Sequence, residues 1–337
     1  MTRRLRILRL VGVGLLAAAL APGLWWRQPP VLLPPDAKPP RLVVVPLSFG
    51  TPSAWPRGLT VAGAWQLKSG SRLFGGYSAM LAGPEGVLTA YSDDATVLRF
   101  AMPGTDAGNV LRFYRLPVGG KSKLDRDLES ATADSTTGQR WFSFEQNNRI
   151  ERFERGSSQF QQVFPRAMAH WPENGGAESM ARLADGRFIV LREVADPLSD
   201  GTRPGLLFPF DPVAGAKPIE FSFRPPIGYD PSDMAVLPDG RVLILLRSLD
   251  LPFPPLFRSK LVLADPRRIA AGKPWPWTEL ATFYGPVPRH NYEGLAIVPD
   301  STGVTLWLIS DDNQAPYQRT LLLELHWGKV PDGARRK

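Results

Sequence analysis

Cysteine is absent from the 337-residue sequence, and histidine occurs only three times. Without cysteine the chain can form no disulfide, zinc–thiolate site or thiol nucleophile. So few histidines do not predict a multi-histidine metal centre. Long amphipathic helical patterns and runs of basic residues are also missing. Because nucleic-acid phosphates are bound by clustered lysine and arginine, we do not expect a nucleic-acid partner.

Turn-forming and aromatic residues are abundant instead. The chain contains 35 prolines and 31 glycines, together with 17 phenylalanines and 10 tryptophans. Helices tolerate many prolines and glycines poorly, whereas aromatic side chains favour strands. The composition therefore predicts many short strands joined by turns, with enough apolar residues for a buried core.

Residues 1–26 have the layout of an export signal peptide. Basic residues precede an apolar run at 10–21, and Arg3 and Arg4 form a pair like that of twin-arginine signals. The alternative is an uncleaved membrane anchor at 10–26, which is at the short limit for crossing a bilayer. Under both interpretations the rest of the chain is periplasmic or secreted. Membrane contact is then expected only through this N-terminal segment.

Residues 27–40 predict a stiff, extended linker, because prolines dominate this stretch. The folded domain is expected at 41–330. Its boundaries follow from the point at which the proline-rich composition gives way to apolar segments separated by turns.

A hairpin-like pattern recurs along the predicted domain. Each copy has a polar residue, a stretch of small apolar residues, a turn ending in glycine, and an apolar strand that closes on polar groups. The copies are 76–94, 127–146, 177–193, 231–248 and 292–312. Asp-Gly pairs in two of the turns favour tight hairpins, because glycine accepts positive φ. Runs such as 188–191 and 242–246 are apolar throughout, which is typical of strands covered on both faces.

Repeats spaced roughly every 50 residues indicate the blades of a β-propeller. The domain has room for six blades, so the expected fold is all-β, with six blades of four-stranded antiparallel sheet. The apolar segments 42–45 and 321–325 would pair and close the ring, which removes an exposed sheet edge. The alternative is a pair of β-sandwiches.

Alignment of the repeats gives two columns of polar residues. The first column precedes the turns and contains Ser78, Glu129, Glu178, Ser232 and Glu293. The second follows the turns and contains Asp93, Glu145, Glu193, Arg247 and Ser310, the last followed directly by Asp311. Because the inner strand of each blade lines the central channel, the first column is expected to form a ring at one mouth. The second column is expected on the opposite lip or between blades.

The three glutamates of the first column, Glu129, Glu178 and Glu293, predict a divalent-cation site. Carboxylate oxygens without cysteine or histidine suit Ca²⁺ or Mg²⁺ better than zinc. Such an ion could neutralise a phosphate ester and lower the pKa of a water nucleophile. The alternative is structural, since carboxylates in repeats also pair with arginine between blades or accept backbone N–H groups.

Arginine side chains could add bidentate contacts to a small anionic molecule. The residues predicted to bind it are Arg149, Arg192, Arg289 and His290, because each lies beside a repeat motif. Arg247, in the second column, is a further candidate for such contacts. No catalytic residue is predicted, because the G-x-S-x-G and S-x-x-K nucleophile motifs are both absent.

The motifs resemble those of a known family, the phytase-like propellers, which are described as having esterase-like activity of phytase. The resemblance is carried by Glu178–Ala181 with Asp185–Arg187, and by Tyr292–Ala296 with Ser310–Asn313. Asp127–Ser130 is similar to the family's D-x-E-G element, with serine in place of the glycine.

The resemblance covers most of residues 55–327 and implies export, a propeller fold and hydrolysis of phosphoester or ester bonds. Together with the carboxylates it supports an exported, divalent-metal-assisted hydrolase that acts on a small anionic substrate. The alternative is a non-catalytic ligand-binding or cell-envelope scaffold propeller. Ser78, Ser232 and Arg247 favour the alternative, because they stand where carboxylates would complete the rings. The sequence leaves open whether the protein is an enzyme.

Overall fold

The computed structural model describes residues 40–106, 110–120, 124–195, 199–250, 256–315 and 317–328. The expected signal or anchor at 1–26 lies outside these residues, as does the linker at 27–40 apart from Pro40. No helix within the described residues is both long and apolar enough to cross a bilayer.

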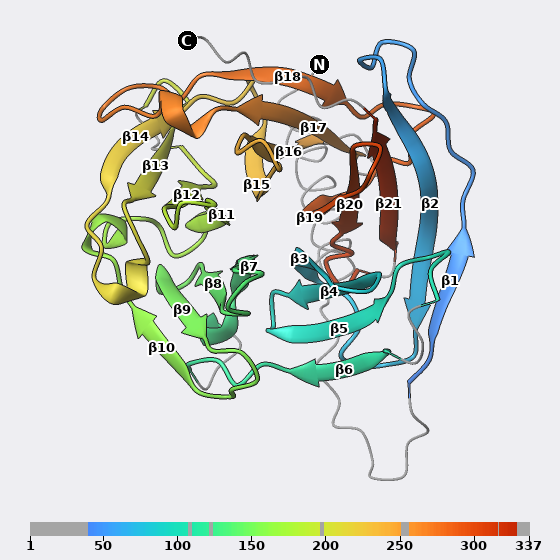
Figure 1. Cartoon of the computed structure of the whole chain (residues 1–337), viewed down its shortest axis with the longest axis horizontal. Helices are drawn as coiled ribbons and strands as arrows, with labels where there is room; N and C mark the ends of the chain where they lie inside the picture. Colours follow the sequence, from blue (N-terminus) through green and yellow to red (C-terminus); the bar gives the residue numbers. More distant parts are fainter. Residues whose placement is uncertain are drawn as a thin grey trace, which may run out of the picture.

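The strands form five antiparallel sheets around a central axis, so the fold is a β-propeller (Figure 1). Blade 1 contains β3 (Tyr77–Gly83), β4 (Val87–Ser92), β5 (Thr96–Ala101) and β6 (Arg112–Arg115). Blade 2 contains β7 (Leu128–Ala133), β8 (Arg140–Phe144), β9 (Arg149–Phe153) and β10 (Phe160–Val163). Blade 3 contains β11 (Ala177–Arg182), β12 (Phe188–Arg192), β13 (Arg203–Phe208) and β14 (Ile219–Phe223).

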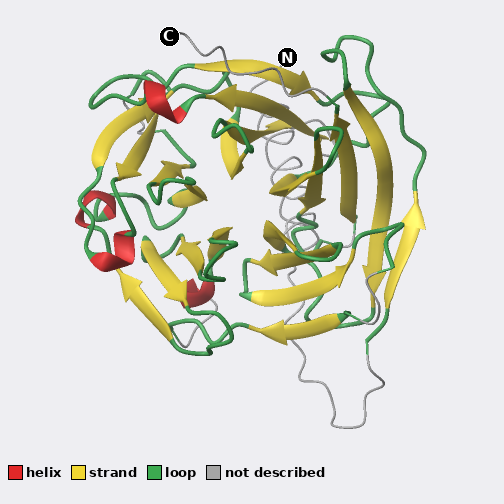
Figure 2. Cartoon of the chain, in the orientation of Figure 1, coloured by secondary structure: helices red, strands yellow, loops and turns green. Residues whose placement is uncertain are grey.

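The last two sheets complete the ring. Blade 4 contains β15 (Asp230–Val236), β16 (Val242–Asp250), β17 (Leu256–Ala264) and β18 (Trp277–Thr282). Blade 5 contains β19 (Tyr292–Pro299), β20 (Val304–Ser310), β21 (Thr320–Trp327), β2 (Leu59–Ser69) and β1 (Leu42–Pro46). Among the described residues Figure 2 shows only short helices, each in a connection between two strands. They are η1 (Leu124–Arg126), η2 (Arg166–Met168), η3 (Pro212–Ala214) and η4 (Pro266–Arg268).

The ring has five blades, so the expectation of six was wrong. The first two strands do not begin a blade of their own. Instead, β2 pairs with the C-terminal β21, with Leu59 opposite Trp327, and β1 adds to the outer edge of β2. N- and C-terminal strands therefore close the ring as expected, but β21 is paired with β2 rather than with 42–45. The residues that would have formed a sixth blade extend the fifth to five strands.

The apolar runs are buried on both faces, as their composition predicts. Along β16, side chains alternate between two hydrophobic clusters. Leu243 and Leu245 pack in a cluster with strands of blade 5, whereas Ile244 and Leu246 pack in a cluster with strands of blade 3. A continuous run of large aliphatic residues is therefore what a blade between two others requires.

Every inner strand carries one β-bulge near its start. In β7, Leu128 pairs with Phe144 and Ser130 pairs with Ser143, so Glu129 is the extra residue between them. A bulge re-aims the side chain of the extra residue and breaks the alternation of the strand. The five bulged residues are Ser78, Glu129, Glu178, Ser232 and Glu293, which together are the first polar column of the sequence.

The residues that follow the bulges close the central axis. These five are all buried, and four of them are small: Ala79, Ser130, Ser179, Asp233 and Gly294. A Cβ added at Gly294 would lie 3.0 Å from the carbonyl carbon of Ala79, so the inner strands of blades 5 and 1 approach closely here. The axis is therefore filled by protein at this level.

The Asp233 carboxylate is the largest group on the closed axis. It accepts hydrogen bonds from the backbone N–H of Leu295 at 2.7 Å and of Met234 at 2.8 Å, and from Ser130 Oγ at 3.4 Å. Ser130 Oγ in turn accepts from Met180 N at 2.9 Å. One carboxylate thereby links blade 4 to blades 2 and 5, and through Ser130 to blade 3.

Candidate functional site

An acidic cavity of about 380 Å³ lies at the end of the axis where the bulges are. Four of the five bulged residues line it, together with residues at the ends of the second strands. Its carboxylates are Asp93, Asp127, Glu129, Glu145, Glu178, Glu193, Glu293 and Asp311. Among the described lining residues Arg247 is the one cation, and the neutral members are Ser78, Gln146, Asn174 and Asn313. We call this space the acidic cavity.

Both polar columns meet in the acidic cavity, so the expectation that the second column lies on the opposite lip was wrong. The two strands of each hairpin are antiparallel, and the end of the second therefore lies beside the start of the first. The pairing of Tyr292 with Ser310 also shows that Asp311, rather than Ser310, is the fifth member of the second column.

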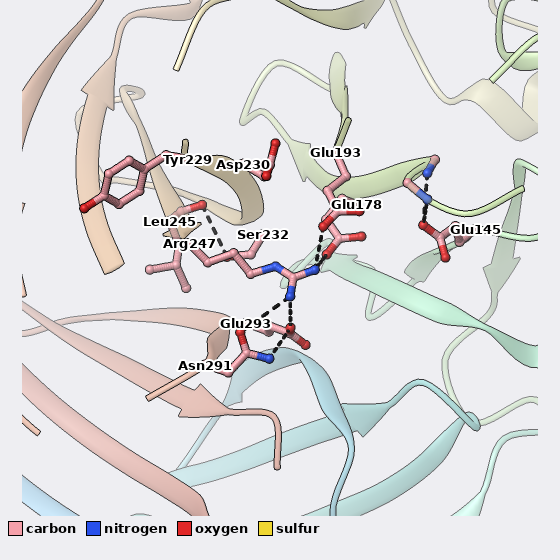
Figure 3. Close-up of polar contacts among 12 residues, drawn as sticks. Glu145, Glu178, Glu193, Tyr229, Asp230, Ser232, Leu245, Arg247, Asn291 and Glu293 are labelled. Carbon is pink, nitrogen blue, oxygen red and sulfur yellow. Dashed lines mark hydrogen bonds and ion pairs between the residues drawn. The ribbon is translucent and has the colours of Figure 1, made fainter. Parts of the chain in front are cut away.

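Arg247 lies between three of the carboxylates (Figure 3). Its Nη1 is 2.8 Å from Glu293 Oε1, and its Nη2 is 2.5 Å from Glu193 Oε1 and 3.4 Å from Glu178 Oε1. Asn291 Nδ2 donates to the same Oε1 of Glu293 at 2.6 Å. The arginine comes from blade 4, and its partners come from blades 3 and 5. It therefore connects the two blades on either side of its own.

A second set of carboxylates in the cavity lies beside the partners of Arg247. Asp127, Glu129 and Glu145 each offer an oxygen, and these oxygens all lie within 4.8 Å of one another. A second such group consists of Glu145, Glu178 and Glu193, so Glu145 belongs to both. Among the described residues no hydrogen bond or ion pair reaches the Glu129 carboxylate. The first group therefore has the donor set and spacing that a hard divalent cation requires.

Glu145 is held in place by the backbone of the next blade. Its Oε1 accepts hydrogen bonds from the N–H groups of Gly175 and Gly176, the second at 3.1 Å. A Cβ at Gly176 would lie 2.4 Å from Asn148 Oδ1, so glycine is needed for this close approach. The Gly-Gly pair before β11 thus fixes one oxygen of a carboxylate shared by both candidate groups.

Burial and mutual repulsion raise the pKa values of these acids. Burial, opposed by the Gly175 N–H and reinforced by the charge of Glu193, raises the pKa of Glu145 to about 7. Burial and the charges of Glu178 and Glu145 raise the pKa of Glu129 well above its usual value. For Glu293 burial outweighs the opposing charge of Arg247, and its pKa is about 6. The cavity therefore favours protons or other cations.

This electrostatic arrangement predicts that the cation-free protein is more stable in mild acid. An acid whose pKa is raised by folding binds protons on folding, so its stabilising contribution is lost as pH rises between the two values. For Glu145 that window runs from 4.5 to about 7, and the shifts of Glu129 and Glu178 have the same sign. His290, with its pKa lowered to about 4, opposes this but is one group against several.

We expect the melting temperature in the presence of a chelator to rise as pH is lowered from about 8 to about 5.5. Circular dichroism melts across that range measure it. Aspartates with lowered pKa values, such as Asp134 and Asp185, lose their contribution only below this window. A melting temperature that falls steadily over the same range would contradict the expected repulsion.

The three predicted metal ligands share the acidic cavity, but the structure groups them differently. Glu129 lies with Asp127 and Glu145, whereas Glu178 and Glu293 contact Arg247. Two of the three glutamates, Glu178 and Glu293, therefore pair with an arginine between blades, which is the structural alternative that the sequence also offers. That any of them binds a metal stays a prediction.

None of the four residues predicted to bind the substrate lines the acidic cavity. Arg149 is buried in blade 2, where its Nε is 2.7 Å from Glu151 and its guanidinium lies over the Phe144 ring. Arg192 is also buried, and its Nε donates to a backbone carbonyl. Substrate binding by these two arginines stays a prediction.

The other two predicted residues lie on the loop before β19. Arg289 is exposed. His290 Nε2 accepts a hydrogen bond from Arg319 N at 3.1 Å, and its ring stacks on Phe257. Burial and the nearby charge of Arg319 lower the pKa of His290 to about 4, so the ring is neutral at neutral pH.

Two residues of the cavity were not predicted in their observed roles. Arg247 was not predicted to pair with the carboxylates of neighbouring blades. The sequence signal for this role was its place in an otherwise acidic column. Asp127 stands two residues before the bulged Glu129 and lies within the quoted Asp127–Ser130 motif. That acidic spacing, at the start of an inner strand, was the signal that could have identified it.

Comparison with known proteins bears on the family. Residues 72–314 match a family model described as "Phytase-like: Esterase-like activity of phytase". This range contains all five inner strands and every residue that lines the acidic cavity. No curated protein matches the sequence.

The solved structures that are similar to this chain have low sequence identity to it. The PQQ-bound aldose sugar dehydrogenase of Streptomyces coelicolor has 14% identity and a TM-score of 0.43, over 86% of this chain and 99% of the other. A hypothetical protein from Leishmania major has 12% identity and a TM-score of 0.44, over 77% and 87%. The WD40 β-propeller domain of Doa1 has 11% identity and a TM-score of 0.39, over 81% and 76%. Likeness at this level carries no information about function.

Proposed function

The chain belongs to the phytase-like family described by esterase-like activity of phytase, and on that premise we propose that its acidic cavity binds Ca²⁺ and hydrolyses a phosphoester or ester bond of a small anionic molecule. The observation that carries the proposal is the group of Asp127, Glu129 and Glu145, whose oxygens lie within 4.8 Å of one another. Their residue types exclude a soft metal, since neither thiolate nor imidazole is present.

Each residue of the group has a distinct part in the proposed site. Glu145 is oriented by two backbone N–H groups, which leaves its second oxygen for a ligand. Gln146 Nε2 donates to Asp127 Oδ2 at 3.2 Å and orients that carboxylate in the same way. Glu129 has no such partner among the described residues, so cation binding would satisfy it. When bound, a divalent ion would neutralise an anionic substrate and acidify a water molecule.

Calcium is expected to stabilise the folded protein. A ligand that binds only the native state adds about 2.7 kcal/mol at one hundred times its Kd, which for a domain of this size is a rise of roughly 5 to 10 °C in melting temperature. The measurement compares melts in CaCl₂, in MgCl₂ and in EDTA at matched ionic strength. Identical melting temperatures in CaCl₂ and EDTA would remove the basis for a calcium site.

The chemical step is tested by a substrate panel. Hydrolysis of nitrophenyl phosphates and nitrophenyl carboxylic esters is followed with CaCl₂ and with EDTA. We expect turnover of at least one class in CaCl₂ and its loss in EDTA. The Glu129→Gln variant serves as the control for a contaminating hydrolase, because such an enzyme would be unaffected by the substitution.

A second candidate function is a binding propeller without catalysis, and one observation favours it. Arg247 already neutralises part of the cavity by contacting Glu178, Glu193 and Glu293. A cavity satisfied by its own arginine resembles a structural network as much as a reaction site. Stabilisation by calcium with no turnover on either substrate class would select this function.

Export to the periplasm or medium is part of the proposal and rests on the pattern of residues 1–26. Fusion of residues 1–40 to a reporter enzyme that is active only after export is expected to give active reporter. Substitution of Arg3 and Arg4 by lysine separates the twin-arginine route from the general one, because only the former requires the arginine pair.

A further inference from the structure

Arg247 occupies a position that is acidic in every other blade. The strand register places one residue at the end of each second strand beside the bulge of its own inner strand. These residues are Asp93, Glu145, Glu193, Arg247 and Asp311. Blade 4 therefore contributes a cation to this column, whereas each of the other four blades contributes a carboxylate.

The bulged residue of the same blade is a serine, as it also is in blade 1. Ser232 stands where blades 2, 3 and 5 carry a glutamate, and its hydroxyl is hydrogen-bonded to the backbone carbonyl of Tyr292 at 3.3 Å. The short side chain leaves room for the arginine, which lies close to it in Figure 3. Ser232 and Arg247 therefore act together: the short serine leaves space, and the guanidinium of Arg247 fills it between blades 3 and 5.

The guanidinium uses carboxylates that could otherwise hold a second ion. Glu145, Glu178 and Glu193 offer oxygens within 4.8 Å of one another, as a cation site requires. Two of these three, Glu178 and Glu193, contact Arg247 Nη2 at 3.4 and 2.5 Å. Within the described residues the ion pairs of Arg247 are with Glu178, Glu193 and Glu293, whereas Glu129 acts on it only through its charge.

We propose that Arg247 is a built-in cation that occupies one of two adjacent cation positions in the acidic cavity and so keeps a second divalent ion out. Glu145 belongs to both positions, and the arginine therefore also decides whether this carboxylate serves one ion or bridges two. The proposal deepens the proposed function, because it concerns the number of ions that the same cavity binds. It does not depend on whether the protein hydrolyses a substrate.

The number of bound calcium ions tests the proposal. The chain is stripped of metal with a chelator, dialysed, and titrated with CaCl₂ in a calorimeter. Arg247→Gln removes the positive charge and keeps a polar, shorter side chain. We expect this variant to bind one more calcium ion than the wild type. Arg247→Lys retains the charge, and we expect it to bind the same number as the wild type.

A second variant guards against loss of folding. Removal of Arg247 leaves three carboxylates without a counter-charge, which destabilises the cation-free state. Arg247→Gln combined with Glu293→Gln removes one of those charges and leaves Glu145, Glu178 and Glu193 intact. This double variant is expected to keep the additional ion. Adding Glu193→Gln to Arg247→Gln is expected to abolish it.

The outcomes separate this proposal from the proposed function. If the wild type, Arg247→Gln and the double variant with Glu293→Gln all bound the same number of calcium ions, at least one each, the inference would be overturned and a calcium site would remain. No calcium in the wild type but one ion in the variants would support the inference and contradict the calcium-dependent function. No calcium in any of them would overturn both.

Discussion

Glutamine at position 129 is expected to weaken calcium binding about 100-fold, while the cation-free variant melts no lower than the wild type. Both effects have one cause. The Glu129 carboxylate has no hydrogen-bond donor in the described structure, and burial together with the charges of Glu178 and Glu145 raises its pKa. Replacing it with a neutral amide removes repulsion from the empty site and a charged ligand from the occupied one.

Calorimetric titration and a melt in EDTA measure the two effects on the same sample. Glu220→Gln is the matched control, because Glu220 is exposed on the outer strand β14, away from the cavity. It is expected to change neither quantity. If Glu129→Gln bound calcium as tightly as the wild type, the group of Asp127, Glu129 and Glu145 would not be the site. If it strongly destabilised the cation-free protein, Glu129 would have a structural role.

Alanine at position 233 is expected to lower the free energy of unfolding by roughly 3 kcal/mol, because three donors lose their acceptor inside the closed axis. The donors are Leu295 N, Met234 N and Ser130 Oγ. Since they belong to three different blades, the loss weakens contacts across the ring as well as within one sheet. For a domain of this size the melting temperature should fall by roughly 6 to 12 °C.

Thermal and urea unfolding measure this change. Asp200→Ala removes an exposed carboxylate that contacts Arg224 at the surface and is expected to cost well under 1 kcal/mol. Asp233→Asn, which keeps one acceptor oxygen, should fall between the two. A melting temperature for Asp233→Ala within a degree of the wild type would mean that water replaces the carboxylate without loss, and that the axis is less tightly closed than the contacts indicate.

The polar columns could be predicted because a repeated hairpin repeats its chemistry. Glu129, Glu178 and Glu293 were identified from the sequence alone, and the structure brings all three to one cavity. The sequence does not display the bulge that makes each of them project from its strand, since an extra residue leaves the pattern of apolar residues almost unchanged. Nor did it show that Asp93 and its equivalents lie at the same end, which follows from antiparallel pairing.

The number of blades could not be derived from chain length. Five repeats were visible, and the remaining residues were sufficient for a sixth blade. Those residues instead form β1 and β2, which contain apolar strand patterns like any other blade strand. Their place in the ring is decided by pairing with β21 across more than 250 residues of sequence, and no local pattern encodes so distant a partner.

Arginines were the least predictable residues. Arg149 follows the Glu145 motif closely, yet the alternation of β9 carries it into the blade, where Glu151 pairs with it. Arg247, in a column of acids, looked like a departure that weakened the case for a ring of carboxylates. Its contacts show that the ring is retained and partly neutralised, because the long side chain reaches carboxylates of two neighbouring blades.

Because Asp233 and its small neighbours fill the axis, the acidic cavity can be reached from only one face of the ring. A ligand that enters the acidic cavity must leave through the same opening, so binding and release use one path. A polymer cannot be threaded through the ring and can present only its terminus or a short projecting group. The opposite face of the ring is separated from the cavity by the filled axis, so contacts made there do not block ligand entry.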